Sequence, residues 1–525
     1  MRVLVWILIL GAVLRLVFLN TVPPGISHDE LDFVNNGYSL VKTGRDLAGD
    51  ALPLTIGGVG HVALPAYLSG VSTFFFGLSL WSVRLVPAIW GILEIGIVYF
   101  ICLHLFRSRT AALVSALLLT VSPWGLKISR AMFDPPTALF FYLLAIWVVV
   151  SALRPDRLVL ATVFLGLGFV SYYGTIFTYP LALLSVLIFR YDLIKANPRI
   201  LVPLSLVILF TGFIFYHMLY GGNQQKTTGR RSEVILSDTQ KISDNVIFDR
   251  FHSTAPDWSD RLFVNKATYV FGQFAQNYFG AFSPAMIFIT GDPNRIYSLW
   301  NRGELPLYTL PLIILGLVSA IRINRKGFWF LLSLLLISPL TSGFTSPVYA
   351  TRAFLIWPVL IIFAGLGSAI VFSFLNRKNK FLRLSGFLLI LSSVSYSLFS
   401  TFHQYFYRYP VYASEMWFES EKQLSNFLGQ NISTGINIFA PEPFALFMEY
   451  IFYNQTDPAD AQTALKTTPI TLDSHTFIFG CPGVPDLNSS LIVFHTCSKP
   501  ADSRALIRTI DKSDRVMWYS YNLPL

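Results

Sequence analysis

Four titratable side chains lie within five positions directly after the first apolar segment of the chain: His28, Asp29, Glu30 and Asp32. A carboxylate at a membrane face is costly unless it is paired or used. Asp29 is well placed to take a proton from an attacking hydroxyl, as a general base does. The same residues also fit an ordinary helix start, with Ser27 or Asp29 as the N-cap.

A second group of charges, Lys127, Arg130 and Asp134, occupies a short turn between later apolar segments. The alternation of basic and less basic loops predicts that this turn lies on the outer face, where lysine and arginine are disfavoured. Their presence there therefore favours a functional role. Arg130 and Asp134 are also spaced so that they would pair on a helix, which is the structural alternative.

Two further arginines each begin an apolar segment on the same predicted face: Arg84 and Arg352. Guanidinium groups suit bidentate contact with phosphate, so Arg84, Arg130 and Arg352 are candidates for binding a donor phosphate. Snorkelling of Arg84 to the interface is the alternative. Tyr172 and Tyr173 end another segment and fit either an aromatic belt or a substrate-lining wall.

Histidine supplies only a weak metal signal. His28 and His61 could join Asp29 around a divalent ion, but the two histidines lack the spacing of a metal motif. We therefore expect no metal site. His28, His61 and Lys127 are predicted instead to line the substrate cavity.

Membrane segments must position these side chains. The chain has 525 residues, of which 54% are hydrophobic and 13% are charged, whereas soluble domains carry about 25% charge. The net charge is +10, but the basic residues lie in short clusters between apolar runs. This pattern indicates membrane topology and not nucleic-acid binding.

About eleven apolar segments approach the roughly 20 residues that a membrane span needs. They lie near 3–20, 82–105, 110–126, 136–153, 158–172, 175–190, 200–219, 304–322, 327–341, 351–375 and 382–400. The first is interpreted as a retained span, because no signal-peptide cleavage site follows it.

Alternate loops between these segments are basic, which predicts that they are cytoplasmic, together with the N-terminus. The long loops 21–81 and 220–303 and the region 401–525 then lie on the outer face. The expected fold is a polytopic α-helical membrane protein with residues 1–400 as the transmembrane domain.

The region 401–525 is predicted to be a small extracytoplasmic α/β domain. Short strand-like runs at 436–439, 476–479 and 491–494 are separated by turn-forming residues. Cys481 and Cys497 both lie in this region, and an outer compartment tolerates disulfides, so we expect them to be bonded. Two buried thiols are the alternative.

Taken together, these motifs resemble the GT-C glycosyltransferase superfamily, in the branch of protein O-mannosyltransferases and the aminoarabinose transferases that modify lipid A. The resemblance rests on Asp29-Glu30 after the first span, Arg84-Leu85-x-Pro87, Ser122-Pro123 with Ser129-Arg130 and Asp134, and Arg352 with Pro358.

The resemblance implies inverting transfer of a hexose or pentose from a polyprenyl-phosphate-linked donor to a lipid, glycan or protein acceptor. It implies that Asp29 is the catalytic base, that Glu30 supports it, and that Asp134 is a second acid near the site. The cell would be bacterial or archaeal, and the membrane its plasma membrane.

Two other functions fit part of the pattern. A transporter or flippase of lipid-linked saccharides would place ionisable groups along a path through the membrane. An inactive relative would serve in assembly. Transporters often contain internal repeats, and the sequence shows none.

Overall fold

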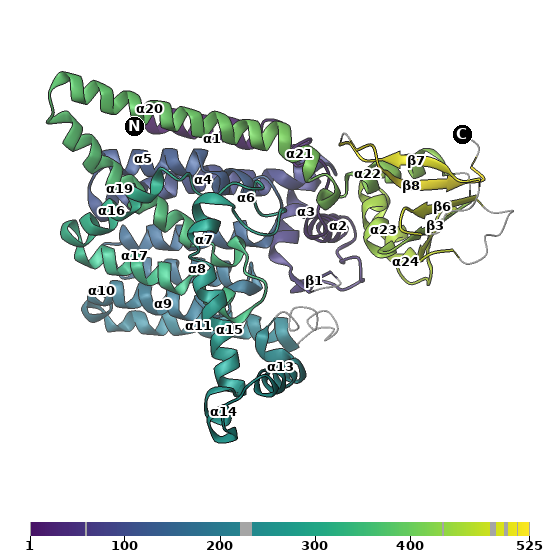
Figure 1. Cartoon of the computed structure of the whole chain (residues 1–525), viewed down its shortest axis with the longest axis horizontal. Helices are drawn as coiled ribbons and strands as arrows, with labels where there is room; N and C mark the ends of the chain where they lie inside the picture. Colours follow the sequence, from purple (N-terminus) through teal and green to yellow (C-terminus); the bar gives the residue numbers. More distant parts are fainter. Residues whose placement is uncertain are drawn as a thin grey trace.

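The computed structural model describes residues 2–57, 60–220, 234–432, 435–482, 490–497, 502–511 and 513–523. A body of helices is joined at one end to a smaller region that contains a β-sheet (Figure 1). Residues 221–233, which begin the predicted loop 220–303, lie outside the described part of the chain.

The first half of the chain is helical apart from one short hairpin. Its elements, in chain order, are α1 (Arg2–Leu16), α2 (His28–Thr43), β1 (Thr55–Ile56), β2 (His61–Val62), α3 (Leu64–Phe76), α4 (Leu80–Phe106), α5 (Arg109–Val121), α6 (Pro123–Ile128), α7 (Asp134–Val150), α8 (Asp156–Phe169), η1 (Tyr173–Thr175), α9 (Thr178–Phe189), α10 (Tyr191–Ala196), η2 (Pro198–Ile200) and α11 (Leu201–Tyr220).

The second half adds more helices before the sheet begins. These elements are η3 (Ile235–Ser237), α13 (Thr239–Phe251), α14 (Asp257–Phe263), α15 (Lys266–Gly280), η4 (Ala285–Ile289), α16 (Thr309–Ile323), α17 (Arg325–Ile337), α18 (Leu340–Phe344), η5 (Ala350–Ala353), α19 (Ile356–Asn376), α20 (Lys380–His403), η6 (Gln404–Arg408), α21 (Tyr409–Tyr412) and η7 (Glu415–Trp417).

Each of the eleven predicted apolar segments contains a helix. Among the described residues, five helical stretches are long and apolar enough to cross a membrane: Leu80–Phe106, Pro198–Met218, Arg325–Phe344, Ile356–Asn376 and Lys380–Tyr412. Shorter helices such as α5 span only about 20 Å, against about 30 Å for the hydrocarbon core. The protein is therefore an integral membrane protein, while a count of eleven spans stays a prediction.

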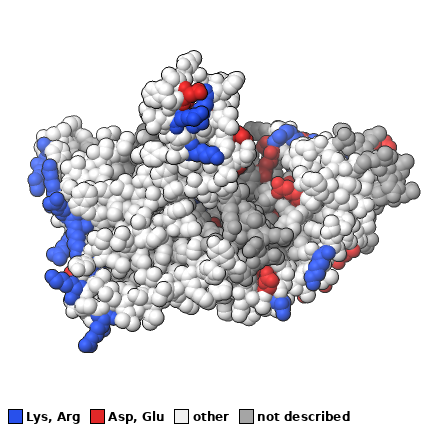
Figure 2. All heavy atoms as spheres, turned by 90° about the horizontal axis from the view of Figure 1, so that it is seen from below, with Lys and Arg blue, Asp and Glu red and all other residues white. Residues whose placement is uncertain are grey.

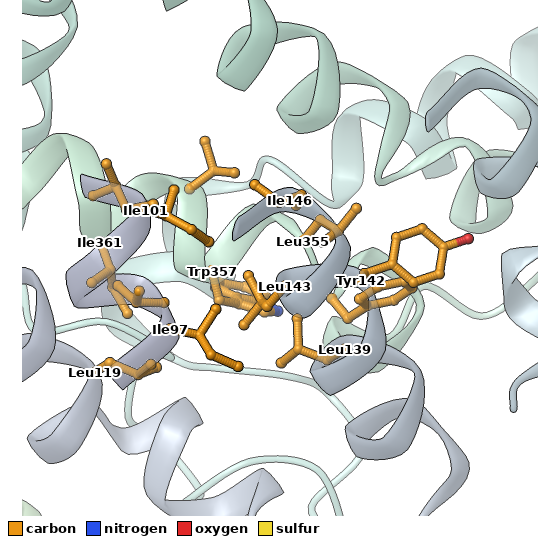
Figure 3. Close-up of a cluster of buried hydrophobic side chains, with 14 of the residues drawn as sticks. Ile97, Ile101, Leu119, Leu139, Tyr142, Leu143, Ile146, Leu355, Trp357 and Ile361 are labelled. Atoms are coloured by element: carbon orange, nitrogen blue, oxygen red, sulfur yellow. The ribbon is translucent and has the colours of Figure 1, made fainter. Parts of the chain in front are cut away.

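The helices pack around a continuous apolar core. Figure 3 shows part of it, where side chains of α4, α5, α7 and α19 meet around Trp357. The Trp357 ring is fully buried, and its indole N–H donates to the Ala350 carbonyl over 3.0 Å. This bond ties the start of α19 to η5, the turn that carries Arg352.

Basic side chains gather at one end of the helical body, the end furthest from the sheet (Figure 2). The α9–α11 and α19–α20 connections lie at this end (Figure 1), and both contain basic residues. The clustering agrees with the alternation of basic loops in the sequence. Which side of the membrane this end faces stays a prediction.

Helices α2 and α3 form the part of the predicted loop 21–81 that faces the sheet region. Ser27 caps α2 and forms a capping box with Glu30, as the sequence allowed. The two helices pack closely because Gly37 and Gly70 face each other, and a Cβ on Gly37 would lie 2.7 Å from the Gly70 nitrogen. A side chain at either position would push the helices apart.

The last part of the chain forms a six-stranded mixed sheet in the order β4-β5-β3-β6-β8-β7. Its elements are α22 (Glu419–Gln430), β3 (Ile436–Ala440), α23 (Pro443–Tyr453), α24 (Pro458–Ala464), β4 (Ile470–Leu472), β5 (His475–Phe479), β6 (Ser490–Phe494), β7 (Arg504–Arg508) and β8 (Val516–Tyr521). The three predicted strands correspond to β3, β5 and β6. Cys481 and Cys497 are joined by a disulfide.

Candidate functional site

A cavity of about 580 Å³ lies where the α2 start, the α7 start, η5 and the α23 start meet. Seven of the residues singled out in the sequence line it: His28, Asp29, Asp32, His61, Asp134, Tyr172 and Arg352. These residues come from segments up to 324 positions apart, between His28 and Arg352. The fold thus gathers two predicted acids and one predicted phosphate-binding arginine in one place.

Asp29 is the second residue of α2, and its carboxylate has two polar neighbours. The His61 Nε2 atom lies 3.4 Å from Asp29 Oδ1, and the Tyr297 hydroxyl donates to Oδ2 over 3.4 Å. The same His61 nitrogen lies 3.6 Å from Asp32 Oδ2. His61 is buried, whereas Asp29 keeps 29% of its side chain exposed, so a substrate in the cavity can reach the carboxylate.

The β1–β2 hairpin places His61 between the two carboxylates. His61 pairs with Ile56 across the hairpin, and its ring packs edge-on against Phe33 of α2. Gly57 turns the chain with φ +72°, and a Cβ there would lie 2.6 Å from Asp32 Oδ2. Only a glycine lets this turn approach Asp32 so closely.

Glu30 and Arg84 form a fully buried ion pair, with 0% of either side chain exposed. Arg84 Nε and Nη2 donate to the two carboxylate oxygens over 2.9 and 3.0 Å. Arg84 also donates to the carbonyls of Leu19, Pro23 and Gly25. These bonds join Arg84 to Glu30 of α2 and to the segment that leads into α2. They therefore fix the position of Asp29, the chain neighbour of Glu30.

Arg130 is also buried, and it does not line the cavity. It donates to the carbonyls of Leu14, Arg15 and Val22 and to the Tyr405 hydroxyl, over 2.8–3.1 Å. The Arg130–Asp134 helical pair that the spacing allowed does not apply, because α7 begins only at Asp134. These contacts favour positioning roles for Arg84 and Arg130 over the predicted contact with a donor phosphate.

Lys127 and Tyr173 do not line the cavity either. The Lys127 ammonium is buried over the rings of Tyr409 and Trp417, at 4.8 and 4.5 Å from their centroids. The Tyr173 hydroxyl donates to the Met218 carbonyl over 3.5 Å. Both residues therefore serve contacts between helices.

Arg352 is the one predicted phosphate-binding arginine that lines the cavity. Its Nη1 donates to the Pro347 carbonyl over 2.8 Å, and its guanidinium lies 4.7 Å from the centre of the Tyr349 ring. Thr351, its neighbour in the chain, also lines the cavity. A guanidinium and a hydroxyl together suit a phosphate oxygen.

Asp292 links the two loops that bring Tyr297 and Arg352 to the cavity. Its carboxylate accepts from the backbone N–H groups of Asn294, over 2.7 Å, and of Ala350. Burial raises the pKa of Asp292 to about 7, although both N–H donors and Arg352 oppose the rise. The carboxylate joins the Tyr297 loop to η5.

His28 lies against the wall formed by the sheet region. Its ring stacks on Phe418 at 4.0 Å, and Nε2 lies 3.8 Å from Glu442 Oε2. Burial lowers the pKa of His28, while Glu442 and Asp29 oppose the shift. Burial thus favours the neutral form of the His28 ring.

Among the described residues, no three His, Cys, Asp or Glu side chains converge on a point that would hold a metal ion. His61 approaches Asp29 and Asp32, whereas His28 faces Glu442. His28 and His61 thus lie on different walls of the cavity.

Sequence reasoning missed several residues of the cavity: Asn294, Tyr297, Tyr349, Thr351, Glu442 and Met448. Glu442 could have been found, because it follows the carboxyl end of the buried parallel strand β3, where α/β sheets commonly bind ligands. Tyr297 and Tyr349 carry no such signal, since tyrosines near a membrane usually belong to the aromatic belt.

Comparison with known proteins gives a family match and likenesses of fold. The family model described as dolichyl-phosphate-mannose-protein mannosyltransferase matches residues 61–216. No curated protein matches the chain.

Solved structures of two proteins resemble this chain in fold. ArnT from Cupriavidus metallidurans, solved apo and bound to undecaprenyl phosphate, has 14% identity and TM-scores of 0.53 and 0.52. The match covers 98% of this chain and 97% of ArnT. The Archaeoglobus fulgidus oligosaccharyltransferase tethered to an acceptor peptide has 15% identity and a TM-score of 0.50.

The match to the oligosaccharyltransferase covers 86% of this chain but only 63% of that protein, so this chain spans less than two thirds of its length. At such identities a likeness establishes the fold and no more. The helical body, the family match and the coverage of ArnT show that this membrane protein has the fold of the GT-C glycosyltransferase superfamily.

Proposed function

We propose that the protein is an inverting glycosyltransferase that moves a hexose or pentose from a polyprenyl-phosphate-linked donor to an acceptor on the extracytoplasmic face. The observation that carries this proposal is the convergence of Asp29, Asp134 and Arg352 on one cavity. ArnT was solved with undecaprenyl phosphate, and the oligosaccharyltransferase with an acceptor peptide. Both ligands are of the classes that the proposal needs.

Asp29 acts as the general base in this proposal. Its carboxylate takes the proton of the acceptor hydroxyl while the oxygen attacks the anomeric carbon of the donor. His61 and Tyr297 hold the carboxylate from two sides. Positioned general bases contribute roughly 10²- to 10⁴-fold to rate.

Arg352 stabilises the leaving group. As the bond from the anomeric carbon to the lipid phosphate breaks, negative charge grows on the phosphate oxygens, and a fixed cation lowers the energy of that state. Direct displacement needs no covalent enzyme intermediate and inverts the anomeric centre. Asp134 lies in the same lining and is a second acid for contacts with the sugar.

The topology belongs to the same proposal. Residues 1–400 form the transferase domain and residues 401–525 an extracytoplasmic domain that closes one wall of the cavity. The N-terminus and the basic end of the helical body face the cytoplasm of a bacterial or archaeal cell.

The test is transfer of radiolabelled sugar from a panel of polyprenyl-phosphate donors in membranes containing the protein. Asp29→Asn should lower transfer by about 10²-fold or more. The matched control is Asp50→Asn, an exposed carboxylate of the same loop that does not line the cavity.

Full transfer by Asp29→Asn would remove Asp29 as the base and direct attention to Asp134. If no donor supports transfer by the wild type, while labelled lipid crosses the membrane, the flippase alternative is correct and the proposal fails.

A further inference from the structure

A second, smaller chamber of about 260 Å³ adjoins the main cavity. The two share His28, Glu442 and Ala445 in their linings, so they meet beside the start of α2. The chamber lies between η7, α22, α23 and the ends of the central strands. The mechanism proposed above does not use it.

Carboxylates dominate the chamber. Four glutamates from three segments line it: Glu415, Glu421, Glu442 and Glu449. Arg515 pairs with Glu415 on the exposed side. His28 and His495 are the other titratable groups of the lining.

Within the part of the chain that the structure describes, Glu449 has no hydrogen-bond partner. Only 1% of this residue is exposed, and neither carboxylate oxygen has a hydrogen bond. Leaving a buried polar group unsatisfied costs roughly 1–3 kcal/mol, and more when the group is charged. A buried acid that lines a chamber, and that no donor of the described residues satisfies, is the mark of a side chain that meets a ligand.

The missing partner must be a cation. A phosphate would be repelled by the four carboxylates, so the donor phosphate belongs in the main cavity with Arg352. A divalent metal is disfavoured, because the donor atoms of the described residues do not converge. An alkylammonium group fits better, since it spreads its three N–H donors over acceptors that lie apart.

We propose that this chamber binds an ammonium group carried by the acceptor. The acceptor portion of this inference rests on the proposed function, because Asp29 is the base for the acceptor and His28, its chain neighbour, borders both spaces. An acceptor anchored by its ammonium in the chamber presents its hydroxyl towards Asp29. The chamber thus selects acceptors by charge.

Binding should strengthen as the pH rises. Burial raises the pKa of Glu449 well above its usual range; Glu421 and Glu419 add to the rise and Lys422 opposes it. A cation must displace the proton from Glu449. The other charged or titratable groups around the chamber or Glu449 are His28, Glu415, Glu442, Tyr453, His495 and Arg515.

The first experiment measures equilibrium dialysis of radiolabelled 1,4-diaminobutane with the purified full chain in detergent, with unlabelled 1,4-butanediol and Mg²⁺ as competitors. We expect the diamine to bind, the diol and Mg²⁺ not to displace it, and Glu449→Gln to weaken binding by about 10- to 150-fold. Asp460→Asn, an exposed carboxylate on α24, is the matched control and should bind normally.

Melting temperature separates loss of the site from loss of the fold. Glu449→Gln keeps the shape of the side chain and replaces an acid whose charged form is already disfavoured by burial, so the variant should melt at or above the wild-type temperature. Absence of diamine binding to the wild type, equal binding by Glu449→Gln, or displacement by Mg²⁺ would each overturn the inference.

Transfer kinetics then identify the carrier of the ammonium. Glu449→Gln should raise the KM for the acceptor and leave the KM for the donor unchanged. A raised donor KM would overturn the assignment to the acceptor. If no sugar is transferred at all, the proposed function fails, while the dialysis result still decides whether the chamber binds ammonium.

Discussion

Replacing Glu30 by glutamine should destabilise the fold, because the neutral amide leaves the buried Arg84 cation without its counter-charge. Both side chains are completely buried, and two hydrogen bonds join them. Breaking such a pair from one side costs about 3–5 kcal/mol. Glutamine keeps one carbonyl oxygen for Arg84, so we expect a loss near the lower end of this range.

The carboxylate of Glu30 has two further tasks. It accepts from the backbone N–H groups of Ser27 and Met132, over 3.2 and 3.0 Å. The first bond closes the capping box of α2, and the second joins α2 to the segment before α7. Without them, Asp29 and Asp134 would shift relative to each other. A displacement of about 1 Å in a catalytic group can cost roughly 100-fold in rate.

The assay is thermal unfolding of the purified protein in detergent, followed by intrinsic tryptophan fluorescence, together with the transfer assay. Glu30→Gln should lower the melting temperature by several degrees and lower transfer as well. Glu30→Gln combined with Arg84→Met should recover part of the lost stability, because removing both charges leaves neither uncompensated. Asp50→Asn supplies the unperturbed reference.

One result would refute this reasoning. If Glu30→Gln melts like the wild type and loses only turnover, Glu30 acts in the chemistry and the ion pair with Arg84 is not its main role. A double variant less stable than both single variants would also contradict the argument, since it would mean that the two charges contribute independently.

Three more outcomes follow from the site and the sheet region. Arg352→Gln should lower transfer by about 10- to 150-fold, the value of a charge-assisted contact, and raise the apparent KM for the donor phosphate in steady-state assays. Burial raises the pKa of Asp292 to about 7, above its unfolded value. The protonated carboxyl therefore stabilises the folded protein at low pH, and this contribution is lost as the pH rises through 7. The melting temperature of the wild type relative to Asp292→Asn should rise when the pH is lowered from 8 to 6. Cys481→Ser opens a disulfide that closes a 16-residue separation and should destabilise the sheet region by about 3 kcal/mol, measured by limited proteolysis with and without reductant.

The sequence predicted the elements well where the signal is local. Ser27 is one of the two N-cap candidates, and α2 begins directly after it. The runs at 436–439 and 491–494 combine apolar residues with turn-forming flanks, and strands form there. Such signals depend on residues that are close in the sequence, so these elements could be predicted without knowledge of the tertiary packing.

The roles of the arginines could not be predicted in the same way. Arg84, Arg130 and Arg352 all stand where a span begins or a loop turns, and the sequence offers no distinction among them. The contacts of each arginine in the structure distinguish their roles. Carbonyls and Glu30 surround Arg84, and carbonyls and Tyr405 surround Arg130. Of the three, only Arg352 lines the cavity. These partners lie 54 to 275 positions away, beyond any local pattern.

Charge is distributed unevenly around the two connected spaces, and this bears on how a transferase would keep its substrates apart. Arg352 lies at one wall of the main cavity, and the glutamates of the side chamber lie beyond His28 and Glu442 at another. A lipid phosphate is attracted to the first wall and repelled by the second, whereas an ammonium group behaves in the opposite way. Asp29 lines the main cavity next to His28, which borders both spaces, so a donor held by Arg352 and an acceptor held in the chamber would meet near Asp29. Reversing the charge at either wall should therefore weaken the binding of one substrate and spare the other, which a purely structural cluster of glutamates would not do.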